Sequence, residues 1–337
     1  MFARHTVTAV EPLTDDAVAL TLDGHRPFAA GQHLTLRRPG TELRRTYSLC
    51  SAQGGALRIA VKRLEGGAFS TWATTQLQVG DVLDVDGPGG SFGSSLTGRG
   101  RLGLVAAGSG ITPVLSLALT ALEQGREVAL VFGNSTTRDV MFLDELADLK
   151  DRHPERLQLL HVLSREEQVS PLLSGRLDTD RTTRIVQALL PDDVTEWCVC
   201  GPFGMVTDVR TALQSCSKAP VHVELFHAEK DPSDGARART RPPGAGRSEV
   251  TVELNGRRSV LTVDPAGAPV LDAVLAVRAD APYACKGGVC GTCRARVVSG
   301  AVEMDVNYAL EPDELAAGIV LTCQAHPTTP TVELQYL

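Results

Sequence analysis

The sequence predicts a protein of three domains: an antiparallel β-barrel, a doubly wound α/β domain and a small cysteine-rich domain. Residues 1–99 contain short alternating strand patterns, whereas residues 100–226 alternate between strand and helix patterns. Four of the eight cysteines lie in residues 248–337. At ~100–200 residues per domain, a chain of this length can form two or three packed domains.

The composition excludes several classes of protein. Hydrophobic residues make up 43% of the 337 residues and charged residues 22%, which is typical of globular proteins rather than of disordered, collagen-like or coiled-coil chains. The aromatic content of 4% and the net charge of −7 argue against nucleic-acid binding. No apolar run approaches the ~20 residues that span a bilayer. Because the N-terminus lacks a signal-peptide pattern, we expect no membrane partner and a cytoplasmic location.

The barrel prediction rests on strand-like runs separated by Gly, Pro and Asp turns. Such spacing is typical of a closed all-β domain. The runs are TVTAVEPL, AVALTLDG, HLTLRRPG, RRTYSLCS, LRIAVKRL and DVLDVDGP.

Residues 100–226 change to a longer period. Apolar strand patterns such as RLGLVAAGSG, EVALVFGN and TEWCVCGP alternate with helical patterns over 113–125, 139–153 and 204–216. This alternation indicates βαβ units and a parallel sheet with helices on both faces.

An exposed linker is expected at residues 227–247, which are rich in Pro, Gly and Arg and lack apolar periodicity. The charge also shifts here. The linker carries 5 basic and 3 acidic residues, whereas residues 248–337 carry 6 basic and 11 acidic residues. The C-terminal domain is therefore small and acidic.

The C-terminal cysteines have the spacing of iron–sulfur ligands. Cys285, Cys290 and Cys293 form C-x₄-C-x₂-C, and Cys323 follows after 29 further residues, which is the plant-type [2Fe–2S] pattern. Glycines 287, 288 and 291 would let the loop wrap closely and present N–H groups to the sulfurs. A structural zinc site is the alternative, but such sites usually pair two short knuckles. A disulfide is disfavoured in the cytoplasm. PYACKGGVCGTC with LTCQA resembles the plant-type ferredoxins, which implies a β-grasp fold.

A flavin site is indicated by RTYS and the glycine-rich VKRLEGGAFS. Arg45 and Tyr47 would face one side of a strand and Ser48 the other. An arginine can clamp a phosphate, and a helix that starts at Ser70 would direct free N–H groups at a pyrophosphate.

With GQHLTL before them, these motifs resemble the flavin barrel of the ferredoxin–NADP⁺ reductase superfamily. Some relatives bind FMN, but the Gly-Gly-x-Phe-Ser loop favours FAD. The resemblance implies that the flavin-binding residues are Arg45, Thr46, Tyr47, Ser48, Val61, Lys62, Gly67, Phe69 and Ser70.

A nucleotide loop is expected at AAGSGITP, between a strand and a helix with Pro113 in its first turn. It fails the G-x-G-x-x-G test for a Rossmann fingerprint but matches the corresponding loop of the same superfamily. The resemblance implies nucleotide binding by Gly108, Gly110, Thr112, Ser164, Arg165, Cys200, Gly201 and Pro202, and a flavin cover at Phe226.

Three of these residues, Tyr47, Ser48 and Cys200, are expected to act in catalysis. In relatives that prefer NADPH, a Ser-Arg pair placed like Ser164 and Arg165 holds the 2′-phosphate, and a guanidinium suits that dianion. Arg138 is a candidate helper. The structural alternatives are an exposed arginine on a charged turn and, for Cys200, a small buried apolar side chain.

The three domains fit one electron-transfer chain. A nucleotide donates two electrons as a hydride and an iron–sulfur cluster accepts one at a time, so a flavin is needed between them. The whole chain resembles the reductase components of multicomponent oxygenases, and in NYALEPDELAAGIVLTCQAHP it is similar to reductases of the 1,2-phenylacetyl-CoA epoxidase type. That implies NADPH, FAD and [2Fe–2S] as cofactors and a di-iron oxygenase as partner. FGNSTTRDV departs from the Arg-containing form expected at this loop. The alternatives are a reductase for another, aromatic-ring oxygenase and a non-enzymatic redox sensor or scaffold.

Overall fold

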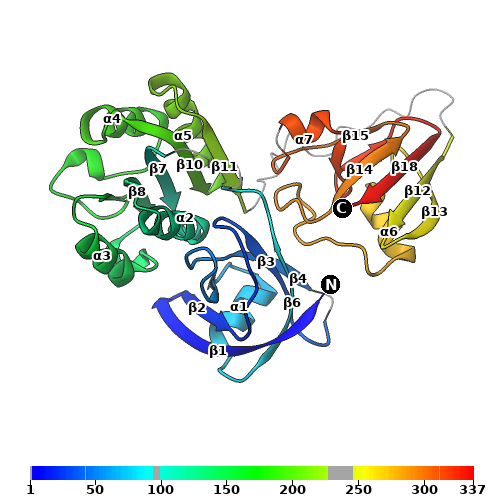
Figure 1. Cartoon of the computed structure of the whole chain (residues 1–337), viewed down its shortest axis with the longest axis horizontal. Helices are drawn as coiled ribbons and strands as arrows, with labels where there is room; N and C mark the ends of the chain where they lie inside the picture. Colours follow the sequence, from blue (N-terminus) through cyan, green and yellow to red (C-terminus); the bar gives the residue numbers. More distant parts are fainter. Residues whose placement is uncertain (1, 42, 94–98, 227–245, 311) are drawn as a thin grey trace. The chain divides into compact units, whose positions relative to one another are not determined.

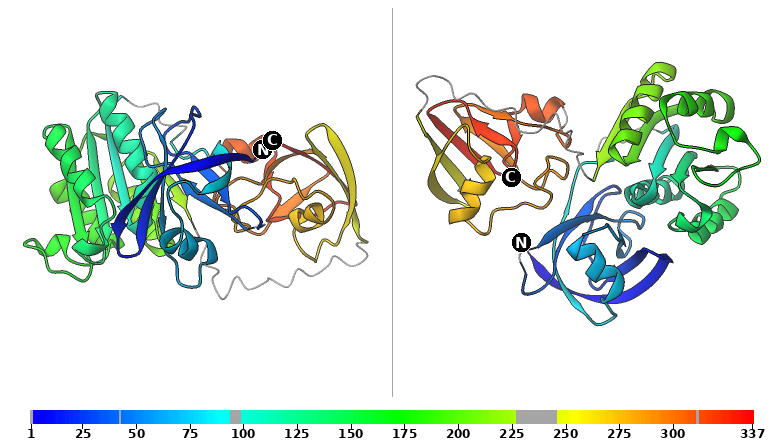
Figure 2. Two further views of the ribbon diagram at one scale, coloured as in Figure 1. Left: turned by 90° about the horizontal axis from the view of Figure 1, so that it is seen from below. Right: turned by 180° about the vertical axis from the view of Figure 1, so that it is seen from behind.

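The computed structural model describes residues 2–41, 43–93, 99–226, 246–310 and 312–337. The chain forms two compact units, Met1–Phe226 and His227–Leu337 (Figures 1 and 2). Of the linker expected at residues 227–247, residues 227–245 lie outside the described part. The domain boundaries 1–99, 100–226 and 248–337 therefore stay predictions.

The first unit begins with the predicted antiparallel barrel. Its sheet has the order β4-β3-β6-β1-β2-β5, and an antiparallel bridge between Leu49 and Ile59 joins the two edges just after β4. Closure removes the exposed edges of the sheet. The elements are β1 (Ala3–Thr14), β2 (Ala17–Leu22), β3 (His33–Arg37), β4 (Arg44–Ser48), β5 (Leu57–Lys62), α1 (Ala68–Thr75) and β6 (Val82–Gly89).

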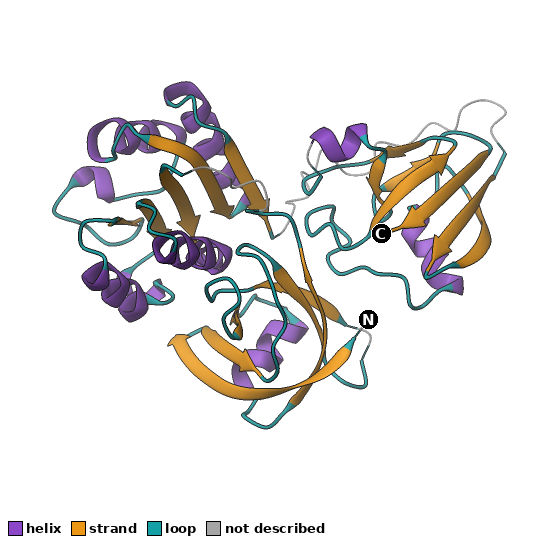
Figure 3. Cartoon of the chain, viewed as in Figure 1, coloured by secondary structure: helices purple, strands orange, loops and turns teal. Residues whose placement is uncertain are grey.

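A parallel sheet of order β11-β10-β7-β8-β9 completes the first unit. Figure 3 draws its strands in orange and the neighbouring helices in purple. Because βαβ crossovers are right-handed, the reversal of strand order after β9 places α4 and α5 on the face opposite α2 and α3, so the doubly wound prediction is confirmed. The elements are β7 (Arg101–Ala107), η1 (Gly108–Gly110), α2 (Ile111–Glu123), β8 (Val128–Asn134), η2 (Thr137–Asp139), α3 (Leu143–Arg152), β9 (Leu157–Leu163), η3 (Pro171–Leu173), α4 (Thr179–Leu189), β10 (Val194–Gly201), α5 (Phe203–Cys216) and β11 (Val221–Leu225).

Two predicted helix starts are wrong by a few residues. The helix expected over 139–153 begins at Leu143, because Phe142 has a left-handed backbone (φ 60°) that interrupts the helix. The helix expected to start at Ser70 begins at Ala68, with Gly67 as its N-cap. Ser70 therefore lies inside the first turn.

The barrel has a core of its own, and a second hydrophobic core is shared between the two sheets of the first unit. Ala17, Ala19 and Cys50 of the barrel belong to the same buried cluster as Leu104 and Ile111 of the parallel sheet and α2. Apolar side chains from both domains are thus removed from water together.

The second unit is a mixed sheet of order β13-β12-β18-β14-β16, in which β12 and β18 run parallel and the other pairs antiparallel. Helix α6 contributes Val270 and Val274 to the core of this sheet, as the β-grasp expectation requires. The elements are β12 (Ser248–Leu254), β13 (Arg257–Val263), α6 (Val270–Val277), β14 (Arg294–Ser299), β15 (Val302–Met304), α7 (Pro312–Ala316), β16 (Ile319–Leu321), β17 (Ala325–Pro327) and β18 (Thr331–Tyr336). Among the described residues, no helix is both long and apolar enough to cross a membrane.

Candidate functional site

Strand β4 presents the RTYS residues in the predicted alternation. Arg45 is exposed, Tyr47 is half-buried, and Ser48 is buried on the other side. The Tyr47 ring packs against Phe69 of α1 with ring centroids 5.5 Å apart, and burial raises the pKa of its hydroxyl. The structure thus joins the two parts of the expected flavin site.

The loop before α1 is built to expose backbone N–H groups. The Ser70 hydroxyl accepts from the Leu64 N–H (3.1 Å) and donates to the Gly67 carbonyl (3.2 Å). A Cβ at Gly67 would lie 2.4 Å from the Ser70 oxygen, so a larger residue here would displace the Ser70 hydroxyl. Ser70 shapes the loop with its side chain, and the first N–H groups of α1 stay available for an anion such as a pyrophosphate.

The remaining flavin candidates lie on β4 and β5. Val61 is fully buried in the barrel core, which leaves its backbone as the part that can contact a ligand. Lys62 ends β5 and lies 3.5 Å from the Asp16 carboxylate. Thr46 is half-buried opposite Thr35.

The nucleotide loop and the CGP motif, distant in sequence, are in direct backbone contact. A Cβ at Gly110 would lie 2.2 Å from the Cys200 carbonyl oxygen, and Gly201 leaves room in the same way for the Met205 methyl group. Gly108 has φ +53° and open space at its Cβ position, so its backbone can be approached closely. Thr112 donates to the Ser109 carbonyl (3.0 Å) and stabilises the turn. These loops lie at the carboxyl ends of β7 and β10, where the strand order reverses and ligands of such sheets bind.

Sequence reasoning did not assign a catalytic role to Glu224, which the structure places beside Ser48 and Cys200. The Ser48 hydroxyl donates to Glu224 Oε2 at 3.4 Å, and Glu224 pairs with Cys200 between β11 and β10. Burial raises the pKa of Glu224 to about 8, and the Ser48 hydrogen bond opposes that rise. Burial and the Glu224 carboxylate also raise the pKa of Cys200. The site therefore holds a neutral thiol next to a carboxyl group that binds a proton near neutral pH.

Phe226, the expected flavin cover, is half-buried against the shared core. Its covering role stays a prediction.

A signal for Glu224 was present in the sequence, since a carboxylate at the end of an apolar strand needs a specific partner.

Ser164 and Arg165 follow β9 at the same carboxyl edge of the sheet. Their N–H groups donate to the carbonyls of Asn134 (2.9 Å) and Ser135 (2.8 Å), and the Arg165 side chain is exposed. Beside them the Glu166 carboxylate accepts from the Thr137 N–H (2.8 Å) and hydroxyl (2.7 Å), and these bonds lower its pKa. The loop thus presents the Arg165 guanidinium, which can bind a phosphate. It also holds the Glu166 carboxylate in place, which the sequence argument did not consider.

The four C-terminal cysteines come together as two pairs of thiols. Hydrogen bonding to Cys290 lowers the pKa of Cys285 to about 5, and hydrogen bonding to Cys293 lowers that of Cys323. Among the described residues, no three His, Cys, Asp or Glu side chains gather as a single metal ion would need. A [2Fe–2S] cluster takes two thiolates at each iron, and the two thiol pairs can supply them.

The cluster loop gives its sulfurs further hydrogen bonds. Gly287 donates its N–H to Cys285 Sγ, and the Gln324 amide donates to Cys323 Sγ, both at 3.3 Å. Gly288 has φ +75°, as expected, but it is Lys286 rather than Gly287 that also adopts a left-handed backbone. Lys286 is held by an ion pair of 2.8 Å with Asp272. Donors around the sulfurs stabilise thiolate ligands.

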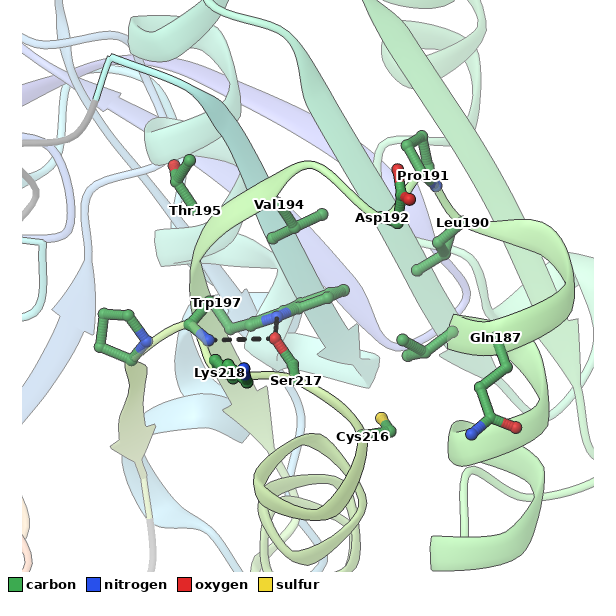
Figure 4. A pocket seen from close by; sticks show the side chains of 13 residues that line it. Gln187, Leu190, Pro191, Asp192, Val194, Thr195, Trp197, Cys216, Ser217 and Lys218 are labelled. Atoms are coloured by element: carbon green, nitrogen blue, oxygen red, sulfur yellow. Dashed lines mark hydrogen bonds between the residues drawn. The ribbon is translucent and has the colours of Figure 1, made fainter.

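A pocket of about 620 Å³ lies elsewhere, at the amino end of β10 between the ends of α4 and α5 (Figure 4). Its wall includes Leu190, Trp197 and Lys218. The Trp197 indole N–H donates to the Ser217 hydroxyl at 3.2 Å. None of the predicted site residues lines this pocket, so it is separate from the redox site.

Comparison with known proteins identifies the domains that carry these residues. Family models match residues 7–93 as an oxidoreductase FAD-binding domain, 104–211 as an oxidoreductase NAD-binding domain and 252–328 as a 2Fe-2S iron-sulfur cluster binding domain. A component of the 1,2-phenylacetyl-CoA epoxidase of Escherichia coli (strain K12) is 41% identical, covering 99% of this chain and 98% of its own. The chain belongs to the ferredoxin–NADP⁺ reductase-type flavoreductases with a C-terminal [2Fe–2S] ferredoxin domain.

Further relatives place this flavoreductase among the reductase components of multicomponent oxygenases. The ferredoxin reductase component of 3-ketosteroid-9-alpha-monooxygenase from Mycobacterium tuberculosis (strain CDC 1551 / Oshkosh) is 36% identical over 92% of this chain and 85% of its own. In fold, the chain is similar to phthalate dioxygenase reductase (TM-score 0.62, 24% identity, 99% and 98% of the two chains). This flavoreductase is an NAD(P)H-dependent flavin and iron–sulfur oxidoreductase.

Proposed function

We propose that this reductase draws electrons from NADPH and delivers them to a di-iron oxygenase that epoxidises the ring of phenylacetyl-CoA. The 41% identity to the Escherichia coli epoxidase component, over nearly the full length of both chains, carries the proposal. The stretch around the fourth cysteine ligand, NYALEPDELAAGIVLTCQAHP, supports it further. FAD, when bound, supplies the conversion of a hydride into single electrons.

The chain's own residues have distinct tasks in this scheme. We assign Arg45 and the first turn of α1 to the flavin phosphates, and Tyr47 and Ser48 to the flavin ring. The backbone at Gly108 and Gly110 would receive the nucleotide pyrophosphate, and we assign the Cys200 thiol to the nicotinamide end of the site. Glu224 holds a proton at its carboxyl group next to Ser48. The four thiols of Cys285, Cys290, Cys293 and Cys323 hold the cluster.

NADPH is proposed as the donor because Arg165 is exposed at the carboxyl edge of the parallel sheet, the edge at which such sheets bind their ligands. A guanidinium can bind the 2′-phosphate with two parallel hydrogen bonds. The nearby Glu166 carboxylate repels a further negative charge such as the 2′-phosphate. The choice of donor thus depends on Arg165, and we assign Arg138 as its helper, since the neighbouring Thr137 bonds Glu166 beside Arg165.

Reconstitution tests the proposal. The purified holoprotein is mixed with the oxygenase components of a phenylacetyl-CoA epoxidase, and epoxide formation is measured with NADPH and with NADH. We expect product only when both components and a reduced nucleotide are present. Rapid reduction of the flavin and cluster without any epoxide would reject the substrate while leaving the reductase function intact.

A second candidate is the reductase of another oxygenase, which the 36% identity to the 3-ketosteroid-9-alpha-monooxygenase component supports. Parallel assays with a steroid 9α-monooxygenase and an aromatic-ring dioxygenase separate these candidates. A non-enzymatic redox sensor would instead fail to reduce an artificial acceptor with NADPH despite full cofactor loading.

The charge of the ferredoxin domain indicates how the partner docks. Residues 248–337 carry 11 acidic and 6 basic side chains, so we propose that they meet a basic patch on the oxygenase. Such steering weakens as salt shortens the range of the field. The second-order rate of electron delivery should fall with ionic strength, and a rate independent of salt would contradict this docking mode.

A further inference from the structure

The barrel and the nucleotide-binding domain are joined by one arginine that contacts both. Arg58, on β5, donates from Nη2 to Glu11 Oε2 on β1 and from Nη1 to Glu145 Oε2 on α3, each at 2.8 Å. Its guanidinium also lies 5.2 Å from the centroid of the Phe142 ring. One side chain therefore connects two strands of the barrel to the first turn of α3. We call this set, Glu11, Arg58, Phe142 and Glu145, the Arg58 clamp.

The Arg58 clamp contacts α3 next to a residue whose backbone conformation is strained. Phe142 has φ 60° and ψ 29°, a left-handed conformation that L-residues other than glycine rarely adopt. The residue is almost completely buried, with 3% of its surface exposed. A strained residue persists only when its surroundings hold it in place, and here the guanidinium and the core do so.

Helix α3 is connected to the carboxyl end of β8, at the edge of the parallel sheet where the nucleotide loops lie. Strand β8 ends at Asn134, whose carbonyl receives the Ser164 N–H, and the segment from there to α3 includes the Thr136–Asp139 capping box. Fixing the first turn of α3 therefore also fixes the end of this segment.

The domain interface has further polar contacts that report on its geometry. The Gln53 N–H of the barrel donates to the Thr120 hydroxyl of α2 at 2.9 Å. At the reacting end, Ser48 donates to Glu224 at 3.4 Å. A small rotation between the domains would stretch both bonds.

We propose that Arg58 is a positioning residue for hydride transfer: by holding Glu145 it fixes the orientation of the nucleotide-binding domain to the flavin barrel. Hydride transfer needs the donor and acceptor atoms within ~3–3.5 Å, and a misplacement of ~1 Å can cost ~10²-fold in rate. Lysine cannot keep both contacts that the planar guanidinium makes with α3 and the residue before it, the Nη1 bond to Glu145 and the packing over the Phe142 ring. This role concerns flavin reduction alone and does not depend on which oxygenase is the partner.

Two matched variants test the clamp. Glu145→Ala removes the bond that crosses between the domains, whereas Glu11→Ala removes an equally long bond within the barrel. Glu145 and Glu11 are 29% and 51% exposed, and such ion pairs contribute little to stability. Both variants should therefore fold and bind flavin like the unaltered protein, which thermal melting and flavin content check.

The readouts are the stopped-flow rate of flavin reduction at saturating NAD(P)H, the nucleotide dissociation constant and hydrogen exchange at the Gln53 amide. Glu145→Ala should lower the rate by about tenfold, an intermediate fraction of the loss for a ~1 Å shift. It should leave the dissociation constant nearly unchanged and speed Gln53 exchange. Glu11→Ala should change none of these by more than about twofold. Arg58→Lys should resemble Glu145→Ala.

A purely structural ion pair would behave differently. If Glu145→Ala reduced its flavin at the rate of the unaltered protein, or if Glu11→Ala lost as much rate, the positioning role would be refuted. Unchanged Gln53 exchange in Glu145→Ala would also refute it, and this measurement needs no turnover.

Discussion

Replacing Gly110 by alanine tests whether contact between the nucleotide loop and β10 sets the rate of flavin reduction. The new Cβ would lie 2.2 Å from the Cys200 carbonyl oxygen and 2.7 Å from the Gly201 nitrogen, where real Cβ atoms stay beyond 3.0 Å. The loop or the strand must therefore move by about 1 Å. A shift of that size can slow a positioned reaction ~10²-fold, equivalent to ~2.7 kcal/mol in the barrier. Overpacking should also cost about 1–3 kcal/mol of stability.

The measurement is the single-turnover rate of flavin reduction by NAD(P)H, together with thermal melting and flavin content. Gly204→Ala is the matched control, because nothing lies within 4 Å of its Cβ position in α5 and alanine favours a helix. We expect the control to reduce its flavin normally. Gly110→Ala with full flavin content and an unaltered reduction rate would show that the backbone contact does not position the nicotinamide.

Three further predictions concern the other sites. Cys290→Ala should abolish the iron–sulfur absorbance while NAD(P)H still reduces the flavin, since the two lie in separate units; loss of flavin reduction would contradict this independence. Arg165→Ala should weaken NADPH binding by about tenfold or more, the worth of a charged hydrogen bond, and leave NADH binding unchanged; equal effects would exclude Arg165 from the 2′-phosphate site. Glu224, with a pKa raised to about 8, should give flavin reduction an inflection near that pH, which Glu224→Gln removes and Ser48→Ala moves upward. Because the folded state binds the extra proton, the Glu224 contribution to stability should fall as pH rises from about 4.5 to about 8; an equal slope in Glu224→Gln would contradict this.

Much of the fold could be read from local patterns. The alternating runs of residues 1–99 correspond to six strands of the barrel because side chains on a strand alternate between core and solvent. The start of α3 was misjudged because a phenylalanine with a left-handed backbone carries no local signal. Its conformation depends on packing against Arg58 and the core.

The sequence by itself determined the cofactors, because each depends on a short motif. The cysteine spacing, the GGAFS loop and the AAGSGITP loop are local, and their chemistry needs those residue types at those spacings. The tertiary structure alone decided which residues meet across the domains. Glu224 meets Ser48, Gly110 meets Cys200 and Arg58 meets Glu145, over separations of 176, 90 and 87 residues. Such contacts arise when two domains bury apolar surface in a common core, and no local periodicity encodes that alignment.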